Sequence, residues 1–419
     1  MSRILLAWEL GRNFGHLATL LPLARYLRQQ GHTILFAIKE TAAAGQLLAP
    51  ELFNYLLSPC SPSRKNRLPP PDSFADILAR AGFGSSEILS ELVRGWHAHF
   101  NCFQPDVLVA QYAPVAQFAA RLSGLPCLQL NTGFEYPPDA RPYPCFRPQP
   151  WLTITQLLAR EEVLLKNINT VSGHHDKPPL PNLQETFKGD IDLLVTLPEL
   201  DHYPGRRNGR YIGPISHLNG QTLLRWSGGQ CPRIFVYLRP FPGIELILET
   251  LAGSNADVIA YIPGLDDRLM AFYANGPVRI SSTPVNVSHL LPEMDLTVSH
   301  AGHGVVTAAL LAGVPMLMLP RNIEQWLLST RVVSLGAGIG LPGERAAGEF
   351  PGVLARMLTD RLYRVAAKGL AQTYAGYNHQ QTIERIANTI DQLPTWLLRR
   401  SSSLPRSPWE HRPRDGYNL

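Results

Sequence analysis

Cysteine is scarce in this sequence. Its 419 residues include five cysteines, an odd number, and no two of them stand at a CxxC spacing. This pattern argues against a disulfide framework and against a zinc ribbon, and it indicates reduced thiols in a cytoplasmic protein. The cysteines are Cys60, Cys102, Cys127, Cys145 and Cys231.

Long hydrophobic runs are also missing. No segment approaches the roughly 18 consecutive apolar residues of a membrane-spanning helix. One basic residue precedes the apolar stretch 4–8 at the N-terminus, and this stretch is too short for a signal peptide. We therefore expect a cytoplasmic protein without a transmembrane segment.

Charge is sparse, and its small surplus is local. Only 17% of the residues are charged, and 38 basic side chains, six of them lysine, stand against 33 acidic ones for a net charge of +5. Residues 399–419 carry +3 of this surplus, which leaves +2 for residues 1–398. Because the body of the protein is close to neutral, we expect no nucleic-acid partner. The segment 396–419 is predicted to be a basic, disordered tail, with weak peripheral membrane contact as the alternative.

The sequence does contain a regular alternation of short apolar runs and helical repeats. The first forty residues predict a strand over 4–9, a loop over 11–15, a helix over 17–27 and a strand over 33–38. This order gives a parallel sheet covered by helices. The alternation restarts after residue 232, so we expect an α/β protein with two Rossmann-like, doubly wound domains that face a central cleft. Further strands are predicted at 106–111, 127–131, 191–197, 234–238, 257–262, 278–281, 296–299 and 315–319, helices at 114–123, 243–251, 304–312, 324–335, 348–374 and 379–392, a broken helical region at 73–103, and loops at 135–150 and 172–190.

The composition also suggests the domain boundaries. We expect an N-terminal Rossmann-like domain over 1–214, a linker over 215–232 and a C-terminal Rossmann-like domain over 233–377. A helix over 378–395 would return towards the N-terminal domain, and the tail over 396–419 would follow it.

The segment 295–325 is the most informative part of the sequence. A strand ending at Ser299 is followed by His-Ala-Gly-His-Gly (300–304), which opens a helix of small residues. Glycines here let a ligand approach the backbone, and the helix N-terminus offers N–H groups and a partial positive charge that suit a diphosphate. The imidazole of His300 adds a donor, and Glu324 and Gln325, after the next strand, can hold sugar hydroxyls. The alternative is an ordinary glycine-rich turn with a capping histidine.

These spacings resemble those of the nucleotide-sugar glycosyltransferases of GT-B fold, specifically the UDP-glucosyl and UDP-glucuronosyl transferase family. That family has the motifs H-G-G-x-G-T, A-x-x-x-G-V-P and P-x-x-x-D/E-Q, and the matching segments here are 300–305, 311–315 and 320–325. The resemblance covers about residues 4–392. Further matches are Gly15-His16-Leu17, Leu21 to Ala24, Gly31-His32, Tyr211-Ile212-Gly213-Pro214 and Leu290-Leu291-Pro292.

The resemblance implies a bacterial-type glycosyltransferase, of hexosyltransferase type, that moves a sugar from a UDP- or dTDP-sugar to an acceptor hydroxyl with inversion. It implies no metal and no cofactor, the nucleotide sugar being a co-substrate. The N-terminal domain would bind the acceptor, which is a small molecule, a lipid or a glycan, and the C-terminal domain would bind the donor. The residues implied are Val285, in the base-binding loop 283–287, His300, Gly302, His303 and Gly304 at the diphosphate, and Glu324 and Gln325 at the sugar.

His16 matches the general base of that family. An imidazole titrates near neutrality and can take the proton of an attacking hydroxyl; the alternative is a helix-capping or core histidine. The family orients its base with an aspartate at the end of the fourth strand, where this sequence has Gln111. Glu9, at the carboxyl end of the first strand, can orient His16 instead, and Glu135 is the weaker candidate.

Two further departures concern the donor half. Val305 replaces the family's threonine and removes one hydroxyl contact to phosphate. Arg239, followed by Pro240, replaces a Gly-Ser/Thr pair, and it either pairs with the diphosphate or is a surface arginine. Gln111 and Val305 favour one alternative, a non-catalytic nucleotide-sugar-binding protein. A second alternative is a nucleotide-sugar epimerase, which would need several acid/base carboxylates in the cleft, and the candidates are Glu9, Glu135 and Glu324.

Overall fold

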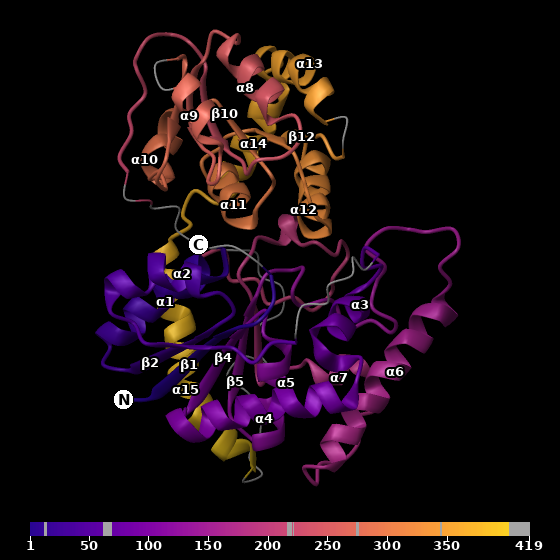
Figure 1. Cartoon of the computed structure of the whole chain (residues 1–419). Helices are drawn as coiled ribbons and strands as arrows, with labels where there is room; N and C mark the ends of the chain where they lie inside the picture. Colours follow the sequence, from indigo (N-terminus) through magenta and orange to yellow (C-terminus); the bar gives the residue numbers. More distant parts are fainter. Residues whose placement is uncertain are drawn as a thin grey trace. The chain divides into compact units, whose positions relative to one another are not determined.

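The computed structural model describes residues 1–11, 15–61, 69–215, 220, 222–273, 276–343 and 346–401, with the side chains of 43 and 395–401 excepted. The chain divides into two compact units, whose elements can be followed by colour in Figure 1. The first unit comprises Met1–Leu197, Tyr203–Ile215 and the segment from Asn378 onwards, and the second comprises Pro198–His202 and Ser216–Tyr377. The expected loop at 11–15, linker at 215–232 and tail at 396–419 lie partly outside the described residues.

The first unit is built on a six-stranded parallel sheet. Its strands are β1 (Arg3–Trp8), β2 (Thr33–Ile38), β3 (Tyr55–Leu57), β4 (Val107–Gln111), β5 (Cys127–Asn131) and β6 (Ile191–Leu194), in the spatial order β3-β2-β1-β4-β5-β6. The central strand β1 places Leu5 opposite Leu35 of β2 and Leu108 of β4. Because helices cover the sheet, β1 and β4 are almost continuously apolar and buried.

Helices pack around this sheet. They are α1 (Gly15–Gln29), α2 (Thr41–Leu47), α3 (Phe74–Leu78), α4 (Ser86–Phe103), α5 (Pro114–Ser123), α6 (Ile154–Gly173), α7 (Leu183–Thr186) and α15 (His379–Ser401). The yellow helix α15 of Figure 1 packs beside α1 and buries Ile383, Ile386 and Ile390 in the core of the first unit. It continues to Ser401, beyond the end expected at residue 395. The loop expected over 172–190 contains α7.

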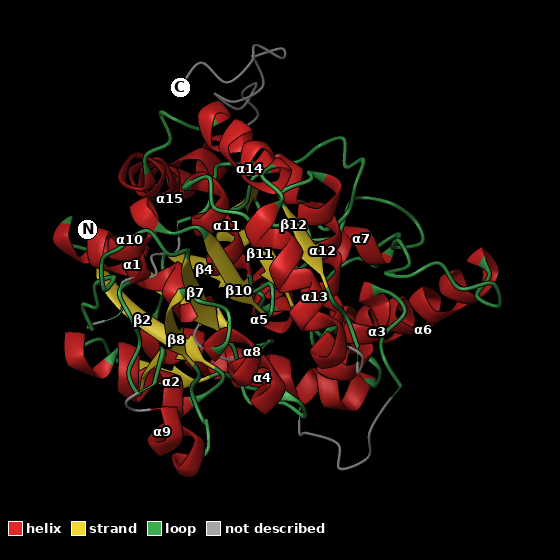
Figure 2. Ribbon diagram, turned by 90° about the horizontal axis from the view of Figure 1, so that it is seen from above, coloured by secondary structure: helices red, strands yellow, loops and turns green. Residues whose placement is uncertain are grey.

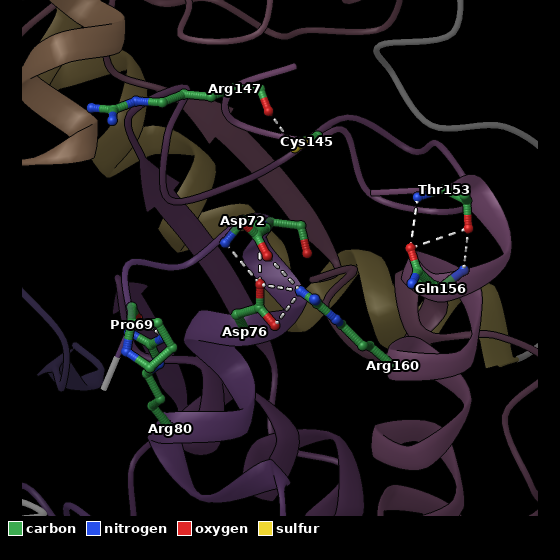
Figure 3. A network of polar contacts seen from close by, with 10 residues as sticks. Pro69, Asp72, Asp76, Arg80, Cys145, Arg147, Thr153, Gln156 and Arg160 are labelled. Atoms are coloured by element: carbon green, nitrogen blue, oxygen red, sulfur yellow. Dashed lines mark hydrogen bonds and ion pairs between the residues drawn. The ribbon is translucent and has the colours of Figure 1, made fainter. Parts of the chain in front are cut away.

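α6 is a long helix to which the sequence analysis assigned no element. Its start is a capping box, because the Gln156 N–H donates to Thr153 Oγ1 at 3.2 Å and the Thr153 N–H donates to Gln156 Oε1 at 2.9 Å. Figure 3 shows Arg160 of this helix between two carboxylates, at 2.9 Å from Asp72 and 3.1 Å from Asp76. These ion pairs tie α6 to the start of α3. The helix lies between two proline-rich loops. A prediction from composition therefore assigns the whole region to loops and does not identify the helix.

The second unit repeats the architecture of the first. Its strands are β7 (Arg233–Tyr237), β8 (Asp257–Tyr261), β9 (Val278–Ser281), β10 (Leu296–Ser299), β11 (Met316–Met318) and β12 (Gly338–Gly340), in the parallel order β12-β11-β10-β7-β8-β9. β10 and β7 are central neighbours, and Tyr237 lies opposite Ser299 where both strands end. The loops after these two strands therefore meet at one edge of the sheet.

The helices of the second unit include one correction to the expected pattern. The segment 348–374 forms two helices, because the N–H of Leu362 donates to the Asp360 carboxylate at 3.0 Å and a new helix begins there. The helices are α8 (Ile244–Ala252), α9 (Asp267–Tyr273), α10 (Val287–Leu290), α11 (His303–Leu311), α12 (Ile323–Ser334), α13 (Ala346–Thr359) and α14 (Leu362–Thr373), and Figure 2 distinguishes them from the strands by colour. Among the described residues, no helix is both long and apolar enough to cross a membrane.

Candidate functional site

A buried histidine lies at the carboxyl edge of the first sheet. His16 is the second residue of α1, Gln111 ends β4, and Glu135 follows β5. Nδ1 of His16 is 2.8 Å from Oε1 of Gln111, and Nε2 of Gln111 donates to the two oxygens of Glu135 at 3.2 and 3.1 Å. The structure thus brings together three side chains that lie far apart in the sequence.

These hydrogen bonds fix which nitrogen of His16 carries the proton. An ionised carboxylate only accepts, so the NH₂ of Gln111 faces Glu135 and the Oε1 of Gln111 faces His16. Nδ1 of His16 therefore donates, and Nε2 keeps a lone pair. Burial lowers the pKa of His16 to about 4, and the hydrogen bond to Gln111 acts in the opposite direction. The ring is consequently neutral at neutral pH.

Two aromatic rings and one glycine surround the imidazole. The ring of Trp8 stacks on His16 with centroids 5.2 Å apart, and the ring of Tyr112 lies 5.8 Å from it. Tyr112 has a left-handed backbone, with φ of 48°, which turns the chain directly after β4. Gly11, with φ of 81°, lies against the ring so closely that a side chain there would strike it. The pocket of the imidazole is therefore shaped by backbone as well as by side chains.

Glu9 does not contact His16. Its carboxylate accepts hydrogen bonds from the N–H groups of Val115 at 2.8 Å and of Ala116 at 2.6 Å, so it caps the N-terminus of α5. Burial raises the pKa of Glu9 to about 8, against the effect of these two bonds. Glu9 was predicted from the sequence to orient His16. In the structure, Gln111 and Glu135 lie next to His16 instead.

The helix α11 begins where β10 ends in the second sheet. Gly302, which has no side chain, is its N-cap residue, and His303 is its first residue. The preceding Ala301 has a left-handed backbone, with φ of 61°. Val305 is buried and brings no hydroxyl to this turn. Gly304 lies in the first turn of this helix. The backbone N–H groups at a helix N-terminus and its partial positive charge are features that suit an anion.

His300 joins the ends of three strands. From the end of β10, its Nδ1 donates to the carbonyl of Leu319 after β11 at 2.7 Å, and its Nε2 accepts from the N–H of Arg239 after β7 at 2.9 Å. Burial lowers the pKa of His300, which keeps the ring neutral. Both ring nitrogens thus form hydrogen bonds to the protein backbone. The imidazole N–H, which was expected from the sequence to donate to a diphosphate, donates to the carbonyl of Leu319 instead.

Two arginines lie on either side of His300. Arg239 and Arg321 are exposed and both lower the pKa of His300 through their charge. The guanidinium of Arg321 lies 5.0 Å from the centroid of the Phe241 ring, which is itself 5.7 Å from the ring of His300. Arg239 was predicted from the sequence as a candidate contact to the diphosphate, whereas Arg321 was not. The clue to Arg321 was its place directly after Pro320, at the carboxyl end of a predicted strand.

Glu324 and Gln325 lie in the first turn of α12. The Gln325 N–H donates to the side chain of Asn322 at 2.9 Å, and its Oε1 accepts from the N–H of Arg321 at 2.8 Å. Gln325 therefore helps to hold the loop that carries Arg321. Glu324 is half-buried beside it.

Val285 lies in the loop between β9 and α10, where the sequence analysis expected the base-binding loop. It forms a single parallel bridge with Thr222. The Thr222 N–H donates to the carbonyl of Pro284 at 3.2 Å, and the Asn286 N–H donates to the carbonyl of Thr222 at 2.9 Å. The hydrogen bonds of this bridge are formed by the carbonyl of Pro284 and the N–H of Asn286, on either side of Val285. The N–H and C=O of Val285 itself therefore point away from Thr222.

Comparison with known proteins finds relatives of the chain. Residues 245–388 match the family described as "Erythromycin biosynthesis protein CIII-like, C-terminal domain". The PGL/p-HBAD biosynthesis rhamnosyltransferase of Mycobacterium bovis is 26% identical over an alignment 381 residues long, which covers 82% of each chain. The L-demethylnoviosyl transferase of Streptomyces niveus is 24% identical over an alignment 400 residues long, which covers 91% of this chain and 92% of the transferase. The chain is a glycosyltransferase that resembles the UDP-glycosyltransferase family.

Solved structures give the fold of this glycosyltransferase. The spinosyn rhamnosyltransferase SpnG is 18% identical and has a TM-score of 0.65, covering 92% of this chain and 100% of its own. The glycosyltransferase SnogD of Streptomyces nogalater is 20% identical and has a TM-score of 0.63, covering 93% and 99%. With two parallel sheets in the chain, these likenesses confirm the expected α/β, GT-B fold class.

Proposed function

We propose that this glycosyltransferase moves a sugar from a UDP- or dTDP-sugar to an acceptor hydroxyl, with inversion and without a metal. The observation that carries the proposal is the hydrogen bond between Nδ1 of His16 and Gln111, which leaves the lone pair on Nε2. SpnG complexed with thymidine diphosphate and VinC in complex with dTDP support a nucleotide-diphosphate donor. SpnG complexed with spinosyn aglycone supports an organic acceptor.

In this proposal the second unit neutralises the diphosphate. The N–H groups at the start of α11, from Gly302 to Gly304, offer donors and the positive end of the helix. The guanidinium groups of Arg239 and Arg321 add two full charges in a fork geometry that suits phosphate oxygens. Positive charge from protein groups then stands where a divalent cation would otherwise be needed.

The remaining contacts to the nucleotide sugar are proposed to come from loops at the same edge of the second sheet. The backbone of Val285 faces away from its bridge and is proposed to read the edge of the base. Glu324 and Gln325 are proposed to bind sugar hydroxyls, because a carboxylate accepts and an amide both accepts and donates. His300 acts indirectly, by holding the three strand ends in place.

The first unit binds the acceptor and supplies the base. As the acceptor oxygen attacks the anomeric carbon, its proton passes to Nε2 of His16, and the bond from that carbon to the diphosphate oxygen breaks. The diphosphate leaves with the electron pair. Inversion follows because the oxygen attacks the face opposite to the leaving group. The acceptor is proposed to be a small molecule, a lipid or a glycan, and a cytoplasmic location stays a prediction.

Calorimetry with dTDP-, UDP- and GDP-sugars, followed by transfer assays, tests this function. We expect a dTDP- or UDP-sugar to bind, and His16→Ala to leave this binding intact while transfer falls by roughly 10²–10⁴-fold. His32→Ala is the matched control, because His32 is also buried in the first unit but pairs with Asp391 of α15. No measurable binding to wild type would contradict the donor assignment. Undiminished transfer by His16→Ala would remove His16 as the base.

Gln111 and the buried Val305 favour one alternative, a non-catalytic nucleotide-sugar-binding protein. That protein would bind the donor with neither transfer nor slow donor hydrolysis. An epimerase would instead release an altered nucleotide sugar without any acceptor, which NMR of the sugar would reveal.

A further inference from the structure

We infer that Glu135 is the positioning residue of the His16 base and acts on it through Gln111. The inference rests on the proposed function, in which His16 takes the acceptor proton. In the family that the sequence resembles, the carboxylate stands at the end of the fourth strand, where this chain has Gln111. Here the carboxylate comes from the loop after β5 and reaches the same imidazole.

The position of Glu135 is fixed by its own loop. The Thr132 N–H donates to Oε2 of Glu135 at 2.7 Å, and the amide of Gln111 donates to both carboxylate oxygens. Glu135 and Gln111 are 6% and 1% exposed, so water does not compete for these bonds. With the carboxylate held, Gln111 has a single amide orientation. That orientation forces the His16 proton onto Nδ1.

Glu135 also faces the charge that the reaction creates. Its Oε1 is 3.5 Å from Nδ1 of His16. When Nε2 accepts the proton, the ring becomes a cation in a buried place, where burial strongly favours the neutral form. A carboxylate at this distance stabilises that cation. The proton stays on Nε2 of His16 until the product has left, and Glu135 itself takes up none.

The other charged groups around the ring have different roles. Lys39, after β2, donates to the carbonyl of Gly11 at 3.0 Å and lowers the pKa of His16. Glu9, after β1, is bonded to the N-terminus of α5. Among the described groups of the first unit, Glu135 is therefore the carboxylate directed at Nδ1.

An exchange of amide and carboxylate separates positioning from folding. In Glu135→Gln, one oxygen becomes an NH₂ that faces the NH₂ of Gln111. We expect the Gln111 amide to turn over and donate to Nδ1 of His16, which moves the ring proton to Nε2 and blocks the base. In the double variant Gln111→Glu with Glu135→Gln, the new carboxylate accepts from Nδ1–H and from the new amide. The bonds to His16 and Thr132 and one of the two bonds between residues 111 and 135 are thus kept.

Nitrogen-15 NMR of histidine rings reads this tautomer in the full chain without any ligand. The chain has 13 histidines, and the His16 resonance is the one lost in His16→Gln. We expect the Nδ1–H tautomer in wild type and in the double variant, and the Nε2–H tautomer in Glu135→Gln at neutral pH. With substrates, kcat should fall by roughly 10²-fold in Glu135→Gln at unchanged KM, and return to within about tenfold of wild type in the double variant.

Glu161→Gln is the matched control for loss of a buried carboxylate. Glu161 accepts from the N–H of Tyr143 and from Gln184, away from His16, so this variant should keep the wild-type tautomer. An unchanged tautomer in Glu135→Gln, or a double variant that fails to recover it, overturns the inference. If wild type shows the expected tautomers but transfers no sugar, the proposed function fails and the positioning by Glu135 stands.

Discussion

Gly11 approaches His16 so closely that a Cβ on Gly11 would stand 2.0 Å from Nε2 of the imidazole. The nitrogen that we propose as the base therefore faces the backbone of Gly11, which has no side chain. The left-handed φ of Gly11 makes glycine the favoured residue there for a second, independent reason.

Gly11→Ala should displace the imidazole and break its hydrogen bond to Gln111. We expect transfer to fall by at least about 10²-fold, the contribution of a general base, with dTDP affinity unchanged. Kinetics and calorimetry on the same preparation check this. Gly124→Ala is the control, because Gly124 is also left-handed but its added Cβ would meet no described atom within 4 Å. Equal losses of transfer in the two variants would contradict the proposed contact.

Arg239→Ala and Arg321→Ala should each weaken dTDP binding by about tenfold, since a charge-assisted hydrogen bond contributes roughly 1.5–3 kcal/mol. The loss should shrink as salt is raised, because ions screen exposed charges. Titration calorimetry at two salt concentrations measures both effects. Arg356→Ala is the control, because Arg356 also lies over an aromatic ring, that of Tyr363 in α14. Unchanged dTDP affinity in both variants would remove the arginines from the donor site.

Ala301→Gly should stabilise the protein, whereas Ala308→Gly should destabilise it. Ala301 has φ of 61°, which is strained for any residue with a Cβ, and relief of this strain exceeds the entropy cost of glycine by roughly 0.5–1 kcal/mol. Ala308 lies inside α11, where glycine costs about 1 kcal/mol. Thermal unfolding of both variants and of wild type measures whether each substitution raises or lowers the stability. Shifts of the same sign would show that residue 301 is not left-handed in solution.

Glu9 should make stability fall as pH rises. Its pKa is raised from 4.5 to about 8 in the folded state, so folded protein keeps a proton that unfolded protein has lost between these values. The contribution of Glu9 to the free energy of unfolding should then decrease between pH 5 and 8 by up to about 1.4 kcal/mol per pH unit. Urea denaturation of Glu9→Gln across this range should show a flatter dependence, while the exposed control Glu91→Gln should keep the wild-type slope. Identical slopes in all three proteins would contradict the prediction.

The donor turn could be predicted from the sequence because its clues are local. The strand, the glycines and the small-residue helix of 296–311 follow one another without interruption. The hydrogen bonds of His300 could not be predicted in the same way. Its two partners, Arg239 and Leu319, lie 61 and 19 residues away, and only the parallel order of the strands brings them to one ring.

The partners of His16 in the first unit could not be predicted from the sequence either. Glu9 and Glu135 both follow apolar strands, so the sequence offers no means of deciding which one lies near His16. The packing of α5 decides it, because its first turn takes the carboxylate of Glu9. The missed helix α6 has a different cause, since Thr153 and Gln156 form a readable capping box but lie beside proline-rich loops.

The helix α15 has a consequence for how the protein is made. Ile383, Ile386 and Ile390 complete the core of the first unit, yet the ribosome reaches them only after it has finished the second unit. The amino-terminal sheet, although synthesised first, is thus the last to close its core. Until then the nascent chain carries an uncovered apolar surface along α1, which is a natural place for a chaperone to bind during translation.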